Sequence, residues 1–274
     1  MVVNFINQDG FKCGVSDYGQ RLFDILKKSK KNQYIQTDDL SVADVNLFNY
    51  HFATMPNLKL SDNKRNVILH HEGGCSVNCK VIEVASLPRP VKEIDFPRQE
   101  NKVTTIGSFG FGFSNKNFYK IAEIVKNEFA SAKIRVNIPY AYYGDYDGIL
   151  ARQELQKMQD VLVDSNIEFE VSHEYLKEDD LIQFLSMNDI NLFLFNEMKG
   201  RGLSSSIDYA LASKRPIGIS RSDMFRHLTD VSSSIFVDEN TIQELIDKGT
   251  EPLNPIYEKN TNQTLIDCID NLIL

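Results

Sequence analysis

The sequence predicts an α/β protein made of two Rossmann-like domains, on three observations. Short apolar or β-branched runs alternate with amphipathic stretches along the whole chain, which is the pattern of βαβ units wound into parallel sheets. The length of 274 residues exceeds the usual size of one domain. The segment SLPRPVKEIDFPRQENK carries three prolines among charges and indicates a linker. We therefore expect a short N-terminal domain at residues 1–95 and a second domain at residues 96–274.

The first series of apolar runs predicts strands around a single helix. The helix follows the first run and is expected near residues 17–28. The strands are expected at VVNFI, YIQT, VNLFNYH, NVILHHE and VIEVASLP, which begin at Val2, Tyr34, Val45, Asn66 and Val81.

The second series predicts strands and helices in alternation. Its strands are expected at VTTIGSFG, KIRVNIPYA, IEFEVSHEY, INLFLFNE, PIGIS and SIFVD, which begin at Val103, Lys133, Ile167, Ile190, Pro216 and Ser234. The helices are expected near residues 115–129, 150–163, 179–187 and 203–213. Apolar residues recur at helical spacing in the tail 257–274, which predicts a closing helix packed on the body.

The composition is that of a folded globular protein, with 42% hydrophobic and 25% charged residues. The net charge of −8 argues against a nucleic-acid backbone as the main partner. No window approaches the roughly 18 to 20 apolar residues of a membrane helix, and the start MVVNFINQDG is unlike a secretory leader, so we expect a cytoplasmic protein. Four scattered cysteines do not form a disulfide framework.

Ligands of open parallel sheets bind at the carboxyl ends of the strands, so candidate site residues follow the apolar runs. After the first run, Gly10 and Gly14 would let backbone N–H groups approach a phosphate or a sugar, although an ordinary turn explains them equally well. His70, His71 and Glu72 follow NVIL. A histidine at such a strand end can bind a sugar hydroxyl, act as an acid or base, or be structural.

A glycine-rich turn, IGSFGFGFSNKNFYK, opens the second series. The spacing of its glycines, which include Gly110, departs from the dinucleotide fingerprint and disfavours NAD. Lys116 is expected in the first turn of the next helix, where the helix dipole favours an acid. A cation there is explained if an anionic group docks beside it.

A second turn, NEMKGRGLSSS, predicts a diphosphate cradle, with a structural turn as the alternative. Glu197 leaves the strand, and the sequence Gly200, Arg201, Gly202 precedes an expected helix start rich in serine hydroxyls. Glycines permit close approach of an anion, and N–H groups, hydroxyls and a guanidinium are its usual donors.

No metal site is expected. Asp145 and Asp147 form an Asp-x-Asp pattern, but Asp and Gly are also the residues that turns prefer. Two histidines precede Cys75 and Cys79, but the Cys-x3-Cys spacing is unusual for a zinc site and a second Cys/His pair is missing. No G-x-S-x-G, Walker or H-E-x-x-H motif occurs, which removes specific support for hydrolase, P-loop and zincin functions.

Taken in order, these segments resemble glycosyltransferases of the GT-B fold, especially retaining family 4 and its bacterial and viral relatives. CGVSDYGQRL is similar to their N-terminal glycine loop and helix, and NVILHHEGG to their strand ending in histidine. GSFGFGFSNKNF resembles the strand that opens their donor domain, with Lys116 at the phosphate-contacting lysine. INLFLFNEMKGRGLSSSIDYALASKRPIGIS is similar to their donor-binding strand, loop and helix.

The resemblance implies two parallel sheets that face each other across a cleft, and a sugar transferred from a nucleoside-diphosphate sugar to an acceptor. The acceptor would be a glycan, a lipid-linked species or a protein, and transfer would be retaining, without metal or cofactor. The residues implied in catalysis are His71, Lys116, Glu197 and Arg201. Those implied in donor binding are Gly14, Gly110, Lys116, Glu197, Gly202, Leu203, Ser204, Ser205 and Asp208.

Two features depart from the family pattern. Family 4 carries two glutamates eight positions apart, whereas Gly200 and Asp208 stand here, with Glu197 as a substitute for the first. An arginine after the first donor-domain strand is missing, which leaves Arg201 as a replacement cation. Two alternatives therefore stay open: a non-catalytic nucleotide-sugar-binding module, and a sugar-nucleotide epimerase of the same fold.

Overall fold

The computed structural model describes residues 1–8, 14–72, 77–97, 100–141, 143–228 and 230–274. Contacts between residues divide the chain into two compact units. The first unit comprises Met1–Pro90, Gly200–Ser205 and Glu258–Leu274, and the second comprises Val91–Lys199 and Ser206–Tyr257.

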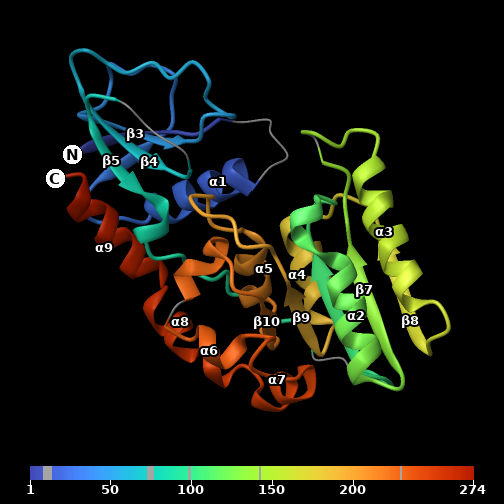
Figure 1. The fold of residues 1–274 in the computed structure, drawn as a ribbon. Coiled ribbons are helices and arrows are strands. Elements are labelled where there is room, and N and C mark those ends of the chain that lie inside the picture. The colour runs from blue at the N-terminus through green and yellow to red at the C-terminus, as the bar shows by residue number, and fades with distance from the viewer. Residues whose placement is uncertain (9–13, 73–76, 98–99, 142, 229) are drawn as a thin grey trace. The chain divides into compact units, whose positions relative to one another are not determined.

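A parallel sheet of five strands, among the described residues, forms the centre of the first unit (Figure 1). Its strands are β1 (Val2–Ile6), β2 (Gln33–Ile35), β3 (Val45–Tyr50), β4 (Arg65–His70) and β5 (Lys80–Glu83). The spatial order is β2-β1-β3-β4-β5, so the chain changes direction across the sheet between β1 and β3. The carboxyl ends of these two strands form a topological switch point, where ligands of such sheets bind.

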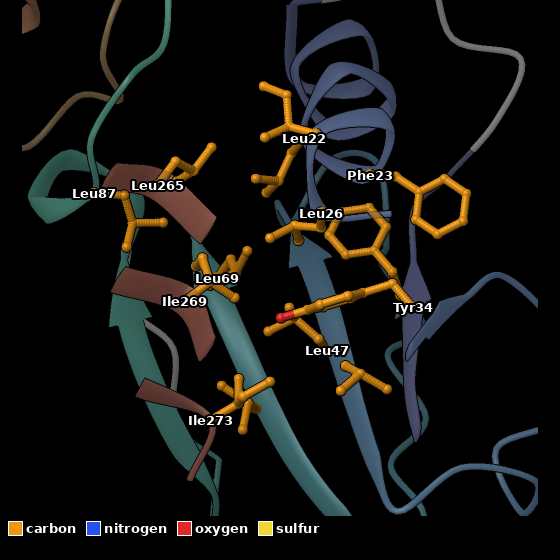
Figure 2. Packing of buried hydrophobic residues seen from close by; sticks show 14 of the residues in the cluster. Leu22, Phe23, Leu26, Tyr34, Leu47, Leu69, Leu87, Leu265, Ile269 and Ile273 are labelled. Carbon is orange, nitrogen blue, oxygen red and sulfur yellow. The ribbon is translucent and has the colours of Figure 1, made fainter. Parts of the chain in front are cut away.

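The core of the first unit joins this sheet to α1 (Gly14–Leu26) and α9 (Asn262–Leu272), and η1 (Val84–Ser86) follows β5. Figure 2 shows Leu22 of α1, Leu47 and Leu69 of the sheet, and Ile269 of α9 in one cluster. Each of these side chains is at most 1% exposed. The apolar face of α9 is therefore buried against the sheet of the first unit.

The closing helix predicted from apolar spacing is α9. Besides its apolar contacts, its buried Asp270 accepts hydrogen bonds from Ser29 Oγ (2.6 Å), Asn32 Nδ2 (2.9 Å) and Tyr34 Oη (2.7 Å). The sequence-based domains had grouped this tail with residues 96–274. A helical period shows which face is buried, but it does not show which core receives that face.

A second parallel sheet forms the centre of the second unit. Its described strands are β6 (Thr105–Phe109), β7 (Ala132–Asn137), β8 (Ile167–Ser172), β9 (Ile190–Phe193) and β10 (Ile217–Ile219). They lie in the order β10-β9-β6-β7-β8, so the switch point falls between β6 and β9. The adjacent Leu192 and Phe193 belong to different hydrophobic clusters, as expected for side chains on opposite faces of a strand.

Helices cover both faces of this second sheet. The cluster around Leu192 includes residues of α2 (Phe118–Glu128) and α3 (Ile149–Leu162), and the cluster around Phe193 includes residues of α5 (Ser206–Ala212). The remaining helices are α4 (Glu178–Ser186), α6 (Ser232–Ile235), α7 (Ile242–Lys248) and α8 (Asn254–Lys259), with 3-10 turns η2 (Ser114–Lys116), η3 (Asp223–Leu228) and η4 (Glu251–Leu253). No described helix is both long enough and apolar enough to cross a membrane.

The α/β class and the two Rossmann-like parallel sheets predicted from the sequence are confirmed. One expected strand is wrong: SIFVD begins in α6, and Phe236 forms only an isolated bridge to Ile219. Three apolar residues in a row are too few to distinguish a strand period from a helical one. The helix expected at 203–213 begins at Ser206, because Gly200–Ser205 packs with the first unit.

The helix expected at 115–129 is also interrupted. Residues 114–116 form η2, and Asn117 adopts a left-handed conformation (φ 52°) before α2 begins. Its side chain donates to the carbonyl of Leu194 and to Asn196 Oδ1, both at 2.7 Å. These two bonds compensate for the unusual backbone and fix Lys116 in a turn ahead of the helix.

Candidate functional site

Polar side chains meet at the β1/β3 switch point of the first unit. Asn49, near the end of β3, donates from Nδ2 to the carbonyl of Val15 (3.0 Å) and to Asn7 Oδ1 (2.9 Å). Asn7, directly after β1, donates from Nδ2 to the carbonyl of Ser16 (3.1 Å). His71 follows β4, and its Nε2 lies 2.7 Å from Asn49 Oδ1. Three strand ends and the first turn of α1 are thus joined by hydrogen bonds.

The imidazole of His71 is held neutral by its surroundings. Its pKa is lowered to about 3, chiefly by burial and then by the positive charge of Arg89. The ring meets Tyr18 edge-on at 5.4 Å between centroids, and the Arg89 guanidinium lies 4.7 Å from the Tyr18 centroid. A base whose conjugate acid is this unstable accepts a proton poorly near neutral pH. The chemistry available to His71 is therefore hydrogen bonding to a polar group.

Glu72 anchors the segment 200–205 in the first unit. Its Oε2 accepts from the backbone N–H of Gly202 at 2.7 Å and lies 3.3 Å from Arg201 Nε. Its Oε1 lies 3.6 Å from His51 Nε2. Contact with His51, the Gly202 N–H and the charge of Arg201 together lower the pKa of Glu72 to about 2. This carboxylate is ionised at physiological pH and holds the segment by charge-assisted hydrogen bonds.

Glycine permits close approach at two positions of this group. A Cβ atom on Gly14, the first residue of α1, would overlap Ser205 Oγ. A Cβ on Gly202 would lie 3.2 Å from both Glu72 Oε2 and the carbonyl oxygen of His71. The segment 200–205 therefore approaches the start of α1 and the end of β4 at backbone distance.

The second unit has its own group at the β6/β9 switch point. Lys116 Nζ lies 3.5 Å from the centroid of Phe195, which follows β9. The carbonyl of Asn115 accepts from the backbone N–H of Asn196 at 2.9 Å, so the turns after β6 and β9 are joined. Glu197, the next residue, is exposed. The turn after β9 thus carries an aromatic ring that holds a cation and, two residues further along the chain, an exposed carboxylate, both of which can bind a polar ligand.

Gly110 and Asp208 complete the predicted residues of this unit. Gly110 has φ +152°, and a Cβ there would lie 3.8 Å from Lys116 Cε. Asp208 is only 3% exposed within α5.

No protein-family model matches the sequence, and no curated protein matches it. Among solved structures, the chain is similar to Anabaena Alr3699/HepE, crystallised in complex with UDP and glucose, with a TM-score of 0.62 over 98% of both chains and 9% identity. An apo structure of OtsA gives a TM-score of 0.57 over 94% of this chain and 76% of that chain, with 10% identity. A trehalose-6-phosphate synthase, OtsA, aligns at a TM-score of 0.46 and 12% identity over 62% of this chain.

The chain spans 43% of the length of that last protein. At 9% and 10% identity, the likenesses to HepE and to the apo structure of OtsA establish the fold alone. The chain has the two-domain GT-B fold.

Within this GT-B fold, the predicted site residues fall into two groups. The first unit contains Gly14, His71, Arg201, Gly202, Leu203, Ser204 and Ser205, and the second contains Gly110, Lys116, Glu197 and Asp208. Lys116 and Arg201, both expected near the diphosphate, therefore belong to different units, and Glu72 of the first unit contacts Arg201 and its neighbour Gly202.

Sequence reasoning missed Asn7, Asn49 and Arg89, and it named Glu72 without its role as an anchor. A signal for Asn49 was present, because an asparagine inside the apolar strand VNLFNY must find hydrogen-bond partners once it is buried. The partners themselves come from other strands and from α1, which the pattern of one strand does not reveal.

The Asp-x-Asp turn has a structural explanation. Asp145 is 3% exposed, and its carboxylate accepts from the backbone N–H groups of Leu150 (2.8 Å) and Ala151 (3.0 Å), in the first turn of α3. Across the described part of the chain, no cluster of three or more His, Cys, Asp or Glu side chains could hold a metal ion. Gly10 and Cys75, named in the sequence argument, lie outside the described residues.

Proposed function

We propose that the protein is a glycosyltransferase that moves a sugar from a nucleoside-diphosphate sugar to an acceptor. The observation that carries this proposal is the likeness over 98% of both chains to a protein crystallised with UDP and glucose. It is supported by the polar groups at both switch points, since open parallel sheets bind ligands there. The acceptor would be a glycan, a lipid-linked species or a protein.

In this proposal the second unit binds the diphosphate through Lys116. Its ammonium over Phe195 is already oriented before a ligand arrives, and preorganised charge stabilises a leaving group without reorganisation cost. Arg201 contacts Glu72 through Nε, and its positive charge is the second cation that we assign to the diphosphate. Such electrostatic stabilisation requires neither a protein nucleophile nor a metal ion.

The sugar is assigned to His71 and Glu197. A neutral His71 binds a hydroxyl by hydrogen bonding, and the exposed carboxylate of Glu197 accepts from sugar hydroxyls. Asp208 would support α5 or anchor the ribose. Retention of configuration and independence of metal complete the proposal.

A panel of nucleoside-diphosphate sugars tests it on the full chain. A bound donor should raise the unfolding temperature, since a ligand at a hundred times its Kd adds about 2.7 kcal/mol of stability. Incubation with that donor and an acceptor extract should then release the free nucleoside diphosphate. Binding with no release would support the binding module, and conversion of the sugar while it stays attached to the nucleotide would support the epimerase.

A further inference from the structure

The hydrogen bonds around Asn49 have a direction that the backbone imposes. The carbonyls of Val15 and Ser16 can only accept, so the amide nitrogens of Asn49 and Asn7 must face them. Asn7 Oδ1 then accepts from Asn49 Nδ2. Asn49 has used its NH2 group on these two acceptors, and its Oδ1 is turned to His71.

A carbonyl-type oxygen facing His71 Nε2 at 2.7 Å requires that this nitrogen carry the proton. A neutral imidazole has one N–H, so Nδ1 is then the nitrogen with a lone pair. Among the described residues Nδ1 has no hydrogen-bond partner, and His71 as a whole residue is only half-buried.

We propose that Asn49 is a positioning residue that fixes His71 in the Nε2-protonated tautomer, so that Nδ1 accepts a hydrogen bond from a hydroxyl of the substrate. The assignment of a substrate hydroxyl to Nδ1 rests on the proposed function, whereas the assignment of the tautomer does not. A lone pair attracts a hydroxyl proton and repels an unprotonated phosphate or carboxylate oxygen. His71 therefore selects the sugar and not the diphosphate.

The charges that face His71 keep it in the neutral form on which this selection depends. Arg89, His51 and His70 disfavour the imidazolium, and Glu72 favours it, but burial has the largest effect. The outcome is a pKa near 3. The tautomer should therefore persist throughout the pH range of an ordinary assay.

The hydrogen-bonded amides of Asn7 and Asn49 pack closely against α1. A Cβ atom on Gly19 would overlap both Asn7 Oδ1 and Asn49 Nδ2. The helix thus approaches the two amides only with glycine at this position. Gly19→Ala therefore displaces Asn49 without changing the chemical identity of any group that touches His71.

Nitrogen-15 NMR of the full chain with labelled histidine tests the tautomer directly. We expect neutral His71 to be protonated at Nε2 between pH 5 and 8, because Nε2 faces the Asn49 Oδ1 acceptor. Asn49→Ala and Gly19→Ala should each convert this signal to a mixture of tautomers. Asn46→Ala is the matched control, because Asn46 is equally buried in β3 but bonds to Asn4 and the carbonyl of Leu40.

A wild-type His71 protonated at Nδ1, or an unchanged tautomer in a folded Asn49→Ala protein, would overturn the proposal. If Asn49→Ala does not fold, the wild-type spectrum and Gly19→Ala still decide it.

Two substitutions of His71 then test which nitrogen the substrate uses. His71→Asn can put an oxygen acceptor where Nδ1 stands, whereas His71→Gln can keep the donor to Asn49 but lacks that acceptor. We expect His71→Gln to lower kcat/KM roughly tenfold more than His71→Asn, with equal affinity for the bare nucleoside diphosphate in both. The reverse order would overturn the role of Nδ1. Absence of transfer with every donor would contradict the proposed function and leave the NMR result standing.

Discussion

Lys116 and Arg201 are both cations expected at the leaving diphosphate, but their surroundings differ. Lys116 is turned onto the ring of Phe195, whereas Arg201 has a half-exposed side chain that contacts the carboxylate of Glu72. Removal of Lys116 deletes a positive charge and its contact with the Phe195 ring. Removal of Arg201 also releases a partner of Glu72, so its effect combines ligand binding with local structure.

Lys116→Ala should weaken binding of the bare nucleoside diphosphate and lower kcat/KM by roughly tenfold to 150-fold, because a charge-assisted hydrogen bond is worth about 1.5–3 kcal/mol. Glu197→Ala should leave diphosphate affinity nearly unchanged and still impair transfer, since its proposed partner is a sugar hydroxyl. Calorimetry with the diphosphate and initial rates with the donor measure both effects. Unchanged diphosphate affinity in a folded Lys116→Ala protein would remove Lys116 from the site.

Acid should destabilise the first unit through His71 and Glu72. The unfolded chain binds protons at these groups near pH 6.5 and 4.5, whereas the folded protein does so only near 3 and 2. The free energy of unfolding should therefore be highest above about pH 6.5 and fall continuously toward pH 2. Glu72→Gln should flatten the pH dependence of this free energy below pH 4.5. At pH 7 it should lower the free energy of unfolding by about 1.5–3 kcal/mol.

Urea unfolding at a series of pH values measures this dependence. A Glu72→Gln protein with the wild-type acid profile would show that the contacts to Arg201 and Gly202 contribute no stability.

At the scale of single elements, the start of α3 depends on Asp145. Its carboxylate satisfies two backbone N–H groups of the first helical turn, which would otherwise be left without partners. Asp147, two residues later, is exposed and lies 3.4 Å from the N–H of Ile149. The two acids of one motif are thus predicted to differ in importance.

Asp145→Ala should lower the free energy of unfolding by about 1–2 kcal/mol, the usual cost of a lost helix cap, whereas Asp147→Ala should change it by less than about 0.5 kcal/mol. Chemical denaturation measures both variants.

The same assignment of Asp145 to a helix cap predicts that transfer does not require a divalent ion. Turnover should survive treatment with EDTA in the wild-type protein. Loss of turnover that manganese or magnesium restores would return Asp145 and Asp147 to a metal role.

At the scale of the whole molecule, the chain returns to its first unit at the C-terminus. Ile269 of α9 is fully buried with Leu47 and Leu69 (Figure 2). Ile269→Ala should lower the free energy of unfolding by about 2–5 kcal/mol, because it leaves a cavity in the core of the first unit. Leu274→Ala is the control, since that side chain is 73% exposed. An equally small effect of both changes on unfolding would show that α9 does not stabilise this core.

Local pattern was sufficient for most of the architecture. The alternation of apolar runs and amphipathic stretches predicted both parallel sheets, because strand and helix periods depend on neighbouring residues alone. It also directed attention to His71, Lys116 and the segment 200–205, since ligand residues of such sheets follow the strands. The apolar run at Ser234 was misassigned because it is too short to show a period.

Tertiary structure decided which of these residues act together. The sequence of β9 and its following loop predicted a cradle, but only the contact with Glu72 groups Arg201 and Gly202 with the first unit. The protonation of His71 likewise depends on Asn49, which is 22 residues away along the chain. Hydrogen-bond direction and pKa are set by groups close in space, and periodicity contains no information about partners on other elements.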